Sequence, residues 1–585
     1  MLRHPVLWLG GLLSLGLFGL FTWQSAPVLH RDDTNIAGAL LAFAGATLIV
    51  ANLAASRAAR NGTDELYDTT PATRQLRTLG QLLALVFPVL GSMLLGAVMF
   101  GYMFLDSPVG TPRIAELAAG PVTVALLGAV GIAIGKWKPH PALGPMAVVI
   151  IAGVEVLFIQ PIIGLSGTSG DLVDRFPWFA LWVPLSLTGE IASELVIRPS
   201  GWHLLYLVGL VVVAVTIALA RAGRRARLIP VVAAGAAGAV LGSLGQLTPV
   251  TASQRAALAA MVEDPEEHQV CEERRGVTYC AYPAYVPWID RWARPVEGAM
   301  RVIPPHARPE GLVVRQRFGT YFEGPIDVPD KTMRRADREL RRAGRSGTGS
   351  TIWTQTQWGR GELEGDYEIG LSLWVAMQAV DLPASREEMR LTPDEVALAR
   401  RAFGARVPER VRHKFERALS RRRAYSCTTL DQARALTALW VAGQATPSTR
   451  ATVERVAAEY PFGFRTYETD GRPYAFYEGP SFWALYPRVS PPMWNWVTFA
   501  ENEFHYAAQL LEKPQHEVAE AIAQRWDQMM DPTAKTTGFL GDFGLAMHPT
   551  PEELTAGLPE DVRIDRWARP RAQLARHLAE MIPCL

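Results

Sequence analysis

The chain falls into two parts with different patterns of hydrophobic and polar positions. Long apolar runs fill roughly the first 250 residues, whereas mixed and amphipathic patterns fill the remainder. A helix needs about 20 mostly apolar residues to cross the hydrocarbon core of a bilayer. Seven runs meet this requirement and predict membrane-spanning helices: 5–23, 34–55, 78–105, 117–135, 144–165, 202–221 and 227–247. The pattern therefore predicts an α-helical polytopic membrane protein.

Charge follows the same division. Residues 1–250 contain only 15 of the 58 Lys and Arg residues and 12 of the 57 Asp and Glu residues. The net charge of +1 gives no excess of positive charge that would indicate a nucleic-acid partner. The charge-rich part, 248–585, is predicted to be a separate water-soluble domain, mainly helical with some β structure.

The basic residues orient the predicted spans, because cytoplasmic loops carry more Lys and Arg. The run 5–23 is long for a signal peptide and no clear cleavage site follows it, so we interpret it as an uncleaved first span. With the N-terminus inside, eleven basic residues flank the spans on the inside and four on the outside. Seven spans then place residues 248–585 on the extracellular side of the plasma membrane.

All four cysteines lie in this second part, as Cys271, Cys280, Cys427 and Cys584. An even number in an extracytoplasmic domain favours two disulfides, whereas four free buried thiols are the alternative. Cys271 and Cys280 flank two short predicted strands with an Arg–Gly turn, so we expect them to close the hairpin. Cys427 and Cys584 remain as the second pair.

The polar segment between the second and third spans, 56–74, reads as a short amphipathic helix followed by a basic stretch that re-enters the membrane. Thr63 is placed to cap this helix, acidic residues fill its first turn and Pro71 ends it. The alternative is a generic interfacial loop. The segment resembles the loop after the second span in permease subunits of type-2 ABC exporters, and these residues match that motif in order: Gly62, Thr63, Glu65, Leu66, Pro71 and Arg74.

The resemblance implies a six-span permease core over residues 1–221. In that family the segment at about 61–72 is the ATPase-coupling helix, which sits in a groove of a cytosolic ABC ATPase. The aromatic stretch at about 170–198 resembles the re-entrant helices on the outer face of such permeases. Residues 222–247 would add a seventh span, and 248–585 a fused extracytoplasmic domain.

The resemblance also implies the partners and cofactors. ATP and Mg would bind to the separate ATPase chain, because Gly135-Lys136 lacks the flanking residues of a phosphate-binding loop and no cofactor is expected in this chain. A second permease copy, identical or related, would complete the transporter, surrounded by membrane lipids. The expected function is export of a hydrophobic or amphipathic substrate.

Glu155 lies in the middle of the fifth predicted span, where a charge costs at least about 2.5–3.5 kcal/mol on insertion scales. Such a residue is expected to face the interior of the helix bundle. One interpretation places Glu155, with Gln160, on a substrate path. The other gives Glu155 a structural hydrogen bond to another span, and both stay open.

The sequence predicts no catalytic residue and no metal site. His516 and Glu517 begin the nearest match to a zinc-peptidase motif, but Glu520 stands where the second histidine is needed. Glu501, Glu503 and His505 cluster on a predicted helix, and we interpret them as part of a solvated helix face. Two alternatives to a transporter remain: a membrane-anchored extracytoplasmic peptidase-like enzyme, and a signalling or immunity membrane protein without transport.

Overall fold

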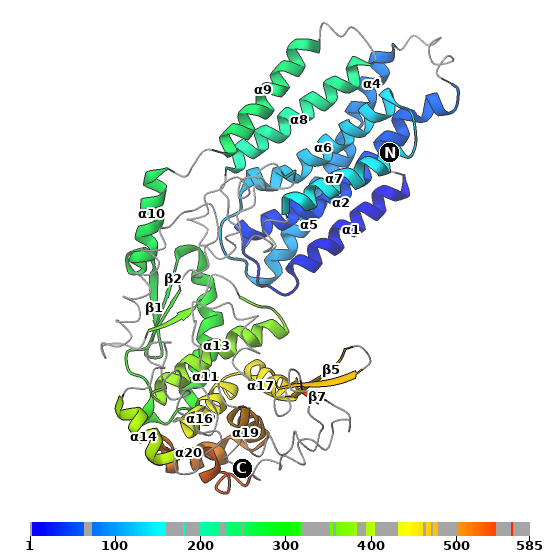
Figure 1. Ribbon diagram of the computed structural model, residues 1–585. Coiled ribbons are helices and arrows are strands. Elements are labelled where there is room, and N and C mark those ends of the chain that lie inside the picture. The colour runs from blue at the N-terminus through cyan, green and yellow to red at the C-terminus, as the bar shows by residue number, and fades with distance from the viewer. Residues whose placement is uncertain are drawn as a thin grey trace. The chain divides into compact units, whose positions relative to one another are not determined.

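The chain folds into two compact units (Figure 1). Unit 1 comprises Met1–Met261 and Tyr321–Asp330, and unit 2 comprises Val262–Thr320 and Lys331–Leu585. The computed structural model describes residues 3–63, 73–159, 180–181, 199–221, 228–247, 251–316, 351–354, 358–382, 393–403, 431–459, 464–469, 472–477, 501–545 and 563–564.

The described part of unit 1 is helical, and six of its helical segments are long and apolar enough to cross a membrane. The predicted fifth span corresponds to α7, whose apolar run, Leu143–Glu155, is shorter. The helices are α1 (Pro5–Thr22), α2 (Leu29–Arg60), α4 (Arg74–Leu83), α5 (Val86–Met103), the 3-10 helix η1 (Phe104–Asp106), α6 (Ile114–Trp137), α7 (Leu143–Ile159), α8 (Ser200–Ala220) and α9 (Ile229–Gln246). Helix α10 (Ala252–Glu263) follows at the boundary between the units.

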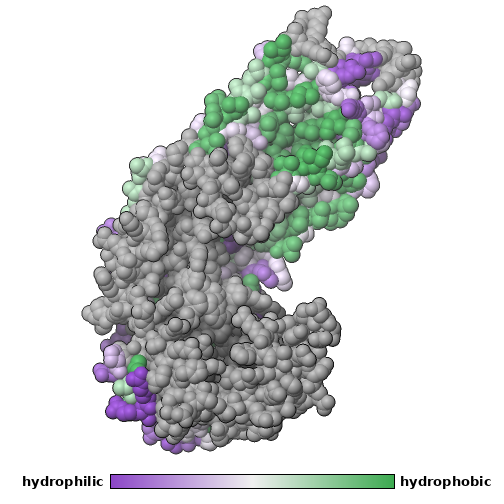
Figure 2. All heavy atoms as spheres, in the orientation of Figure 1, coloured by the Kyte–Doolittle hydropathy of each residue, from purple (hydrophilic) through white to green (hydrophobic). Residues whose placement is uncertain are grey.

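Large apolar side chains cover the outside of these helices. Leu12, Leu94 and Val149 are 66%, 68% and 71% exposed, and they come from three different helices. Figure 2 shows hydrophobic residues along the helices and hydrophilic ones at the end where α4 lies. Soluble proteins rarely expose so much contiguous apolar surface, so this belt indicates contact with lipid. The chain is therefore a multi-pass helical membrane protein.

Helix α2 forms the core of unit 1, since it packs on α1, α5, α6 and α7. Its closest neighbour is α6, which presents glycines to the α2 backbone. A Cβ atom at Gly131 would overlap the Leu48 carbonyl oxygen, and one at Gly135 would lie 2.9 Å from the Asn52 carbonyl oxygen. Close backbone approach over small residues is how membrane helices gain packing energy in the absence of a hydrophobic driving force.

The third predicted span, 78–105, is two helices rather than one. Helix α4 ends at Leu83, and α5 begins at Val86 after a break at Ala84 and Leu85. Pro88 has no N–H to donate to the Ala84 carbonyl, and its ring crowds that carbonyl. The interruption therefore lies one turn before Pro88, at Ala84 and Leu85.

The described residues of unit 2 form helices and two small sheets. Its strands are β1 (Val270–Arg274), β2 (Val277–Ala281), β3 (Val313–Gln316), β4 (Thr351–Thr354), β5 (Phe464–Thr469), β6 (Arg472–Tyr477) and β7 (Arg563–Ile564). Its helices are α11 (Ile289–Val302), α13 (Glu362–Ala379), α14 (Pro393–Phe403), α16 (Gln432–Gly443), α17 (Pro447–Glu459), α19 (Glu501–Glu512) and α20 (Gln515–Met529). Short 3-10 helices are η5 (Pro265–His268), η6 (Pro283–Trp288), η7 (Pro305–Ala307) and η11 (Thr536–Gly538).

The first sheet has the order β1-β2-β3-β4, with β1 antiparallel to β2 and the other pairs parallel. Helix α11 packs on β2 and α13, and it buries Trp292, Val296 and Ala299. Four fully buried aromatic residues at β2 and η6 extend this core: Tyr279, Tyr282, Tyr285 and Trp288. These large side chains give unit 2 a hydrophobic core of its own.

Candidate functional site

The segment between α2 and α4 begins with a helix C-cap. Gly62 has a φ of +66°, a left-handed conformation that glycine adopts without strain. The Gly62 N–H donates to the Ala59 carbonyl at 3.3 Å, and the Thr63 N–H donates to the Ala58 carbonyl at 3.0 Å. This pair of bonds is a Schellman motif, so Gly62 and Thr63 end α2. The hydroxyl of Thr63 also donates to the Ala58 carbonyl.

On the far side of the segment, Thr73 caps α4, because its hydroxyl accepts from the Leu76 N–H at 3.2 Å. Arg74 is the first residue of α4. Glu65, Leu66 and Pro71 lie outside the described residues, as does most of the predicted coupling helix, 61–72.

Glu155 is buried, with 6% of its surface exposed, and both of its carboxylate oxygens accept from the Leu181 N–H at 3.2 and 3.1 Å. The carbonyl of Leu181 accepts from the Thr123 hydroxyl at 2.8 Å. One residue between α7 and α8 is therefore held from α7 on its N–H side and from α6 on its carbonyl side. Gln160 lies outside the described residues.

This contact lies well inside the bundle. Thr123 is nine residues past the start of α6, which is about 14 Å along the helix, and Glu155 is twelve residues past the start of α7, about 18 Å. Leu181 packs against two apolar clusters of unit 1, and Ala180 is fully buried. Non-helical backbone at membrane depth needs partners for its polar groups, and Glu155 and Thr123 supply them.

A second polar cluster joins the first turns of three helices, and the sequence analysis missed it. Asp33 of α2 accepts from the Arg113 N–H at 2.7 Å, and Glu116 of α6 accepts from the Ser200 hydroxyl of α8 at 2.6 Å. Asp32, Asp33 and Glu116 are each at most 1% exposed. The helix dipole stabilises carboxylates at helix N-termini. Acidic residues in the first turns of the predicted helices were therefore the signal in the sequence that could have predicted this cluster.

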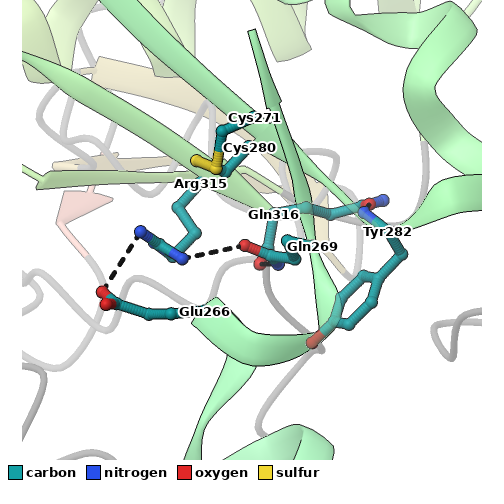
Figure 3. Close-up of a disulfide and its surroundings, with 7 residues drawn as sticks. All are labelled: Glu266, Gln269, Cys271, Cys280, Tyr282, Arg315 and Gln316. Carbon is teal, nitrogen blue, oxygen red and sulfur yellow. Dashed lines mark hydrogen bonds and ion pairs between the residues drawn. A yellow bond between two sulfur atoms is a disulfide. The ribbon is translucent and has the colours of Figure 1, made fainter.

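The predicted disulfide between Cys271 and Cys280 is present and joins directly opposite residues of β1 and β2. Cys427 and Cys584 lie outside the described residues. Figure 3 shows Arg315 of β3 beside the disulfide. The Arg315 guanidinium forms an ion pair with Glu266 at 3.1 Å and donates a hydrogen bond to the Gln269 side-chain oxygen at 3.2 Å. These contacts tie η5 to the sheet next to the hairpin.

The residues considered for a zinc peptidase belong to α19 and α20. Within the described part of the chain, no three His, Cys, Asp or Glu side chains are placed to hold a metal ion together. Nε2 of His505 lies 2.9 Å from Nε2 of Gln509 on the next turn of α19. Burial lowers the pKa of His505, and the negative charge of Glu512 opposes this shift.

No family model, no curated protein and no solved structure matches this chain. Its function therefore has to be inferred from its own residues.

Proposed function

We propose that this chain is the permease subunit of a type-2 ABC exporter with a fused extracytoplasmic domain. The observation that carries the proposal is the motif from Gly62 to Arg74. This segment leaves the capped end of α2, the central helix of the bundle, and leads into α4. A cytosolic ATPase that pushes on the segment acts directly on α2, which packs on α1, α5, α6 and α7.

In this proposal, ATP closes a partner ATPase dimer, and residues 61–72 transmit the closure to α2. Because α2 and α6 are packed backbone to backbone, they move as one body. A hydrophobic or amphipathic substrate then leaves between two permease copies toward the outer face. ATP and Mg belong to the partner chain in this scheme, and the permease supplies the path.

The contacts between helix ends support seven crossings. Helices α2, α6 and α8 begin at one common end, because Asp33, Arg113, Glu116 and Ser200 join their first turns. In the proposed topology, the chain returns across the bundle between the end of α6 and the start of α8, and α7 provides this crossing. Helix α9 ends near the start of α8, where Nδ1 of His203 lies 2.9 Å from Oε1 of Gln246.

An odd number of crossings separates the N-terminus from unit 2. With the positive-inside orientation, the coupling segment faces the cytoplasm and unit 2 faces outward. The disulfide between Cys271 and Cys280 supports this, since disulfides persist on the oxidising side of a membrane.

The orientation predicts how these cysteines react in intact cells of the native host. In a variant with Cys427 and Cys584 changed to serine, a membrane-impermeant maleimide is expected to label the protein only after an impermeant reductant opens the remaining disulfide. The same protein with Cys271 and Cys280 also changed to serine is the blank. Labelling without reductant, or labelling only after the cells are lysed, would contradict an outward disulfide-bonded unit 2.

The permease function itself predicts a stoichiometric partner. Purification from the native host in a mild detergent is expected to recover an ATPase chain, identified by mass spectrometry, with measurable ATP hydrolysis. Glu65→Arg and Leu66→Arg are each expected to lower recovery of the ATPase at least about tenfold, because a reversed charge or a buried cation disrupts a docked helix.

Glu310→Arg serves as the control, since it introduces the same charge change at an exposed position of unit 2. It is expected to leave recovery of the ATPase unchanged. A chain that purifies without any ATPase would refute the permease function and favour an extracytoplasmic enzyme or a signalling role.

A further inference from the structure

Unit 2 contains an open polar groove along one face of α11. It consists of two adjoining pockets of about 550 and about 410 Å³ that share three lining residues. The lining residues that matter for binding are Arg275, Arg294, Glu297, Arg301, Glu368 and Ser448. Pockets of this size suit small ligands.

The β1–β2 turn forms one wall of the groove. Arg275 and Gly276 both have positive φ, at +50° and +78°, which makes the turn tight. Arg274 forms an ion pair with Asp290 of α11, and Arg275 forms one with Glu297 at 2.7 Å. Hydrogen bonds to Glu272 and, as the second cause, to Asp290 raise the pKa of Arg274. The disulfide and these ion pairs fix the turn against α11.

Two glycines bring the opposite wall close. A Cβ at Gly298 of α11 would overlap the Ala445 carbonyl oxygen, and a Cβ at Gly365 of α13 would lie 2.7 Å from the Ser448 carbonyl oxygen. The turn between α16 and α17 therefore packs directly against the backbones of α11 and α13. This packing places Thr446 and Ser448 beside Glu368.

Glu368 lines the smaller pocket, and its carboxylate is only half satisfied. It is 1% exposed, and its Oε2 atom accepts from the hydroxyls of Thr446, at 2.6 Å, and Ser448. Within the described part of the chain, its Oε1 atom has no hydrogen-bond partner. A buried carboxylate oxygen without a donor is unfavourable, so the pocket is built to receive a donor, best a cationic one.

Arginines supply the opposite charge in the same pocket. Arg294 is paired with Glu364 at 2.9 Å, and Arg275 with Glu297. Arg301 is exposed and makes no ion pair among the described residues. Its guanidinium has the donor geometry that carboxylate and phosphate groups match.

We propose that this groove binds a small zwitterion, whose ammonium group meets Glu368 and whose carboxylate or phosphate group meets Arg301 and Arg294. A free amino acid and an ethanolamine phosphate headgroup share this chemistry. The proposal rests on unit 2 alone and stands whether or not the chain is a permease.

The test is calorimetric titration of the full-length protein in phosphatidylcholine nanodiscs with glycine, L-glutamate and O-phosphoethanolamine. Acetate and ethylamine, which carry one charge each, are expected to bind about tenfold or more weaker than the best zwitterion. Addition of phosphatidylethanolamine to the nanodiscs distinguishes the sources. If phosphatidylethanolamine competes with the soluble zwitterion, the site binds a lipid headgroup. If it does not compete, the site binds a free molecule.

Glu368→Gln and Arg301→Gln are each expected to weaken binding about tenfold or more. Glu454→Gln and Arg525→Gln remove the same charges from exposed ion pairs outside the groove, and they are expected to change binding by no more than about twofold. If Glu368→Gln fails to fold, the exposed Arg301 decides the outcome. Absence of zwitterion binding, or equal binding by the Arg301 variant, overturns the proposal.

Discussion

Replacement of Gly131 by leucine is expected to prevent assembly of the bundle in unit 1. The new side chain would begin inside the Leu48 carbonyl, and a backbone atom of the central helix cannot move aside as a side chain can. Overpacking in a protein core typically costs about 1–3 kcal/mol. Because this overlap forces α2 and α6 apart along their contact, we expect a cost at or above the top of that range.

The measurement is the yield of monodisperse protein in detergent, together with its thermal unfolding midpoint. Gly19→Leu in α1 and Gly101→Leu in α5 are matched controls, since a Cβ at either position meets no atom within 4 Å among those described. Both are expected to behave as wild type. A stable, monodisperse Gly131→Leu protein would show that α2 and α6 do not pack closely.

The sequence predicts six of the seven expected spans of unit 1 well, because a bilayer imposes a simple rule of length and hydropathy. The rule locates each helix without reference to its neighbours. It fails where polar atoms from distant residues meet, as they do at Glu155 and Leu181 or at Glu116 and Ser200. Nothing in the local sequence specifies these pairs, since the partners are separated by 26 and 84 residues.

Unit 2 shows the same difference between local features, which the sequence predicts, and contacts between distant segments, which it does not. The hairpin and its disulfide are local, and both were predicted correctly. The start of helix α14 is also local, because Pro393 occupies its first position. Helix α11 depends on tertiary packing, because Pro295 interrupts its hydrogen-bond ladder and the burial of Trp292 and Val296 compensates for that loss. The parallel pairing of β2, β3 and β4 joins segments more than 30 residues apart and left no local signal.

Substitutions of Glu155 distinguish the two roles that the sequence left open for this residue, a place on the substrate path and a structural hydrogen bond. Glu155→Gln keeps an acceptor for the Leu181 N–H, so we expect an unfolding midpoint close to wild type. Glu155→Leu leaves that N–H without a partner inside the bundle, which costs about 1–3 kcal/mol. Thr123→Val is expected to cost less, because an unpaired carbonyl is tolerated better than an unpaired N–H.

The control is Thr216→Val in α8, which is expected to be nearly neutral, because the Thr216 hydroxyl donates to the Val212 carbonyl of its own helix. ATP hydrolysis by the co-purified complex adds a second readout. Retained hydrolysis in the stable Glu155→Gln protein supports a structural carboxylate, which is the result that the bonds to Leu181 favour. A Glu155→Leu protein as stable as Glu155→Gln would show that the contact with Leu181 does not hold the segment, and a stable but inactive Glu155→Gln protein would return Glu155 to the substrate path.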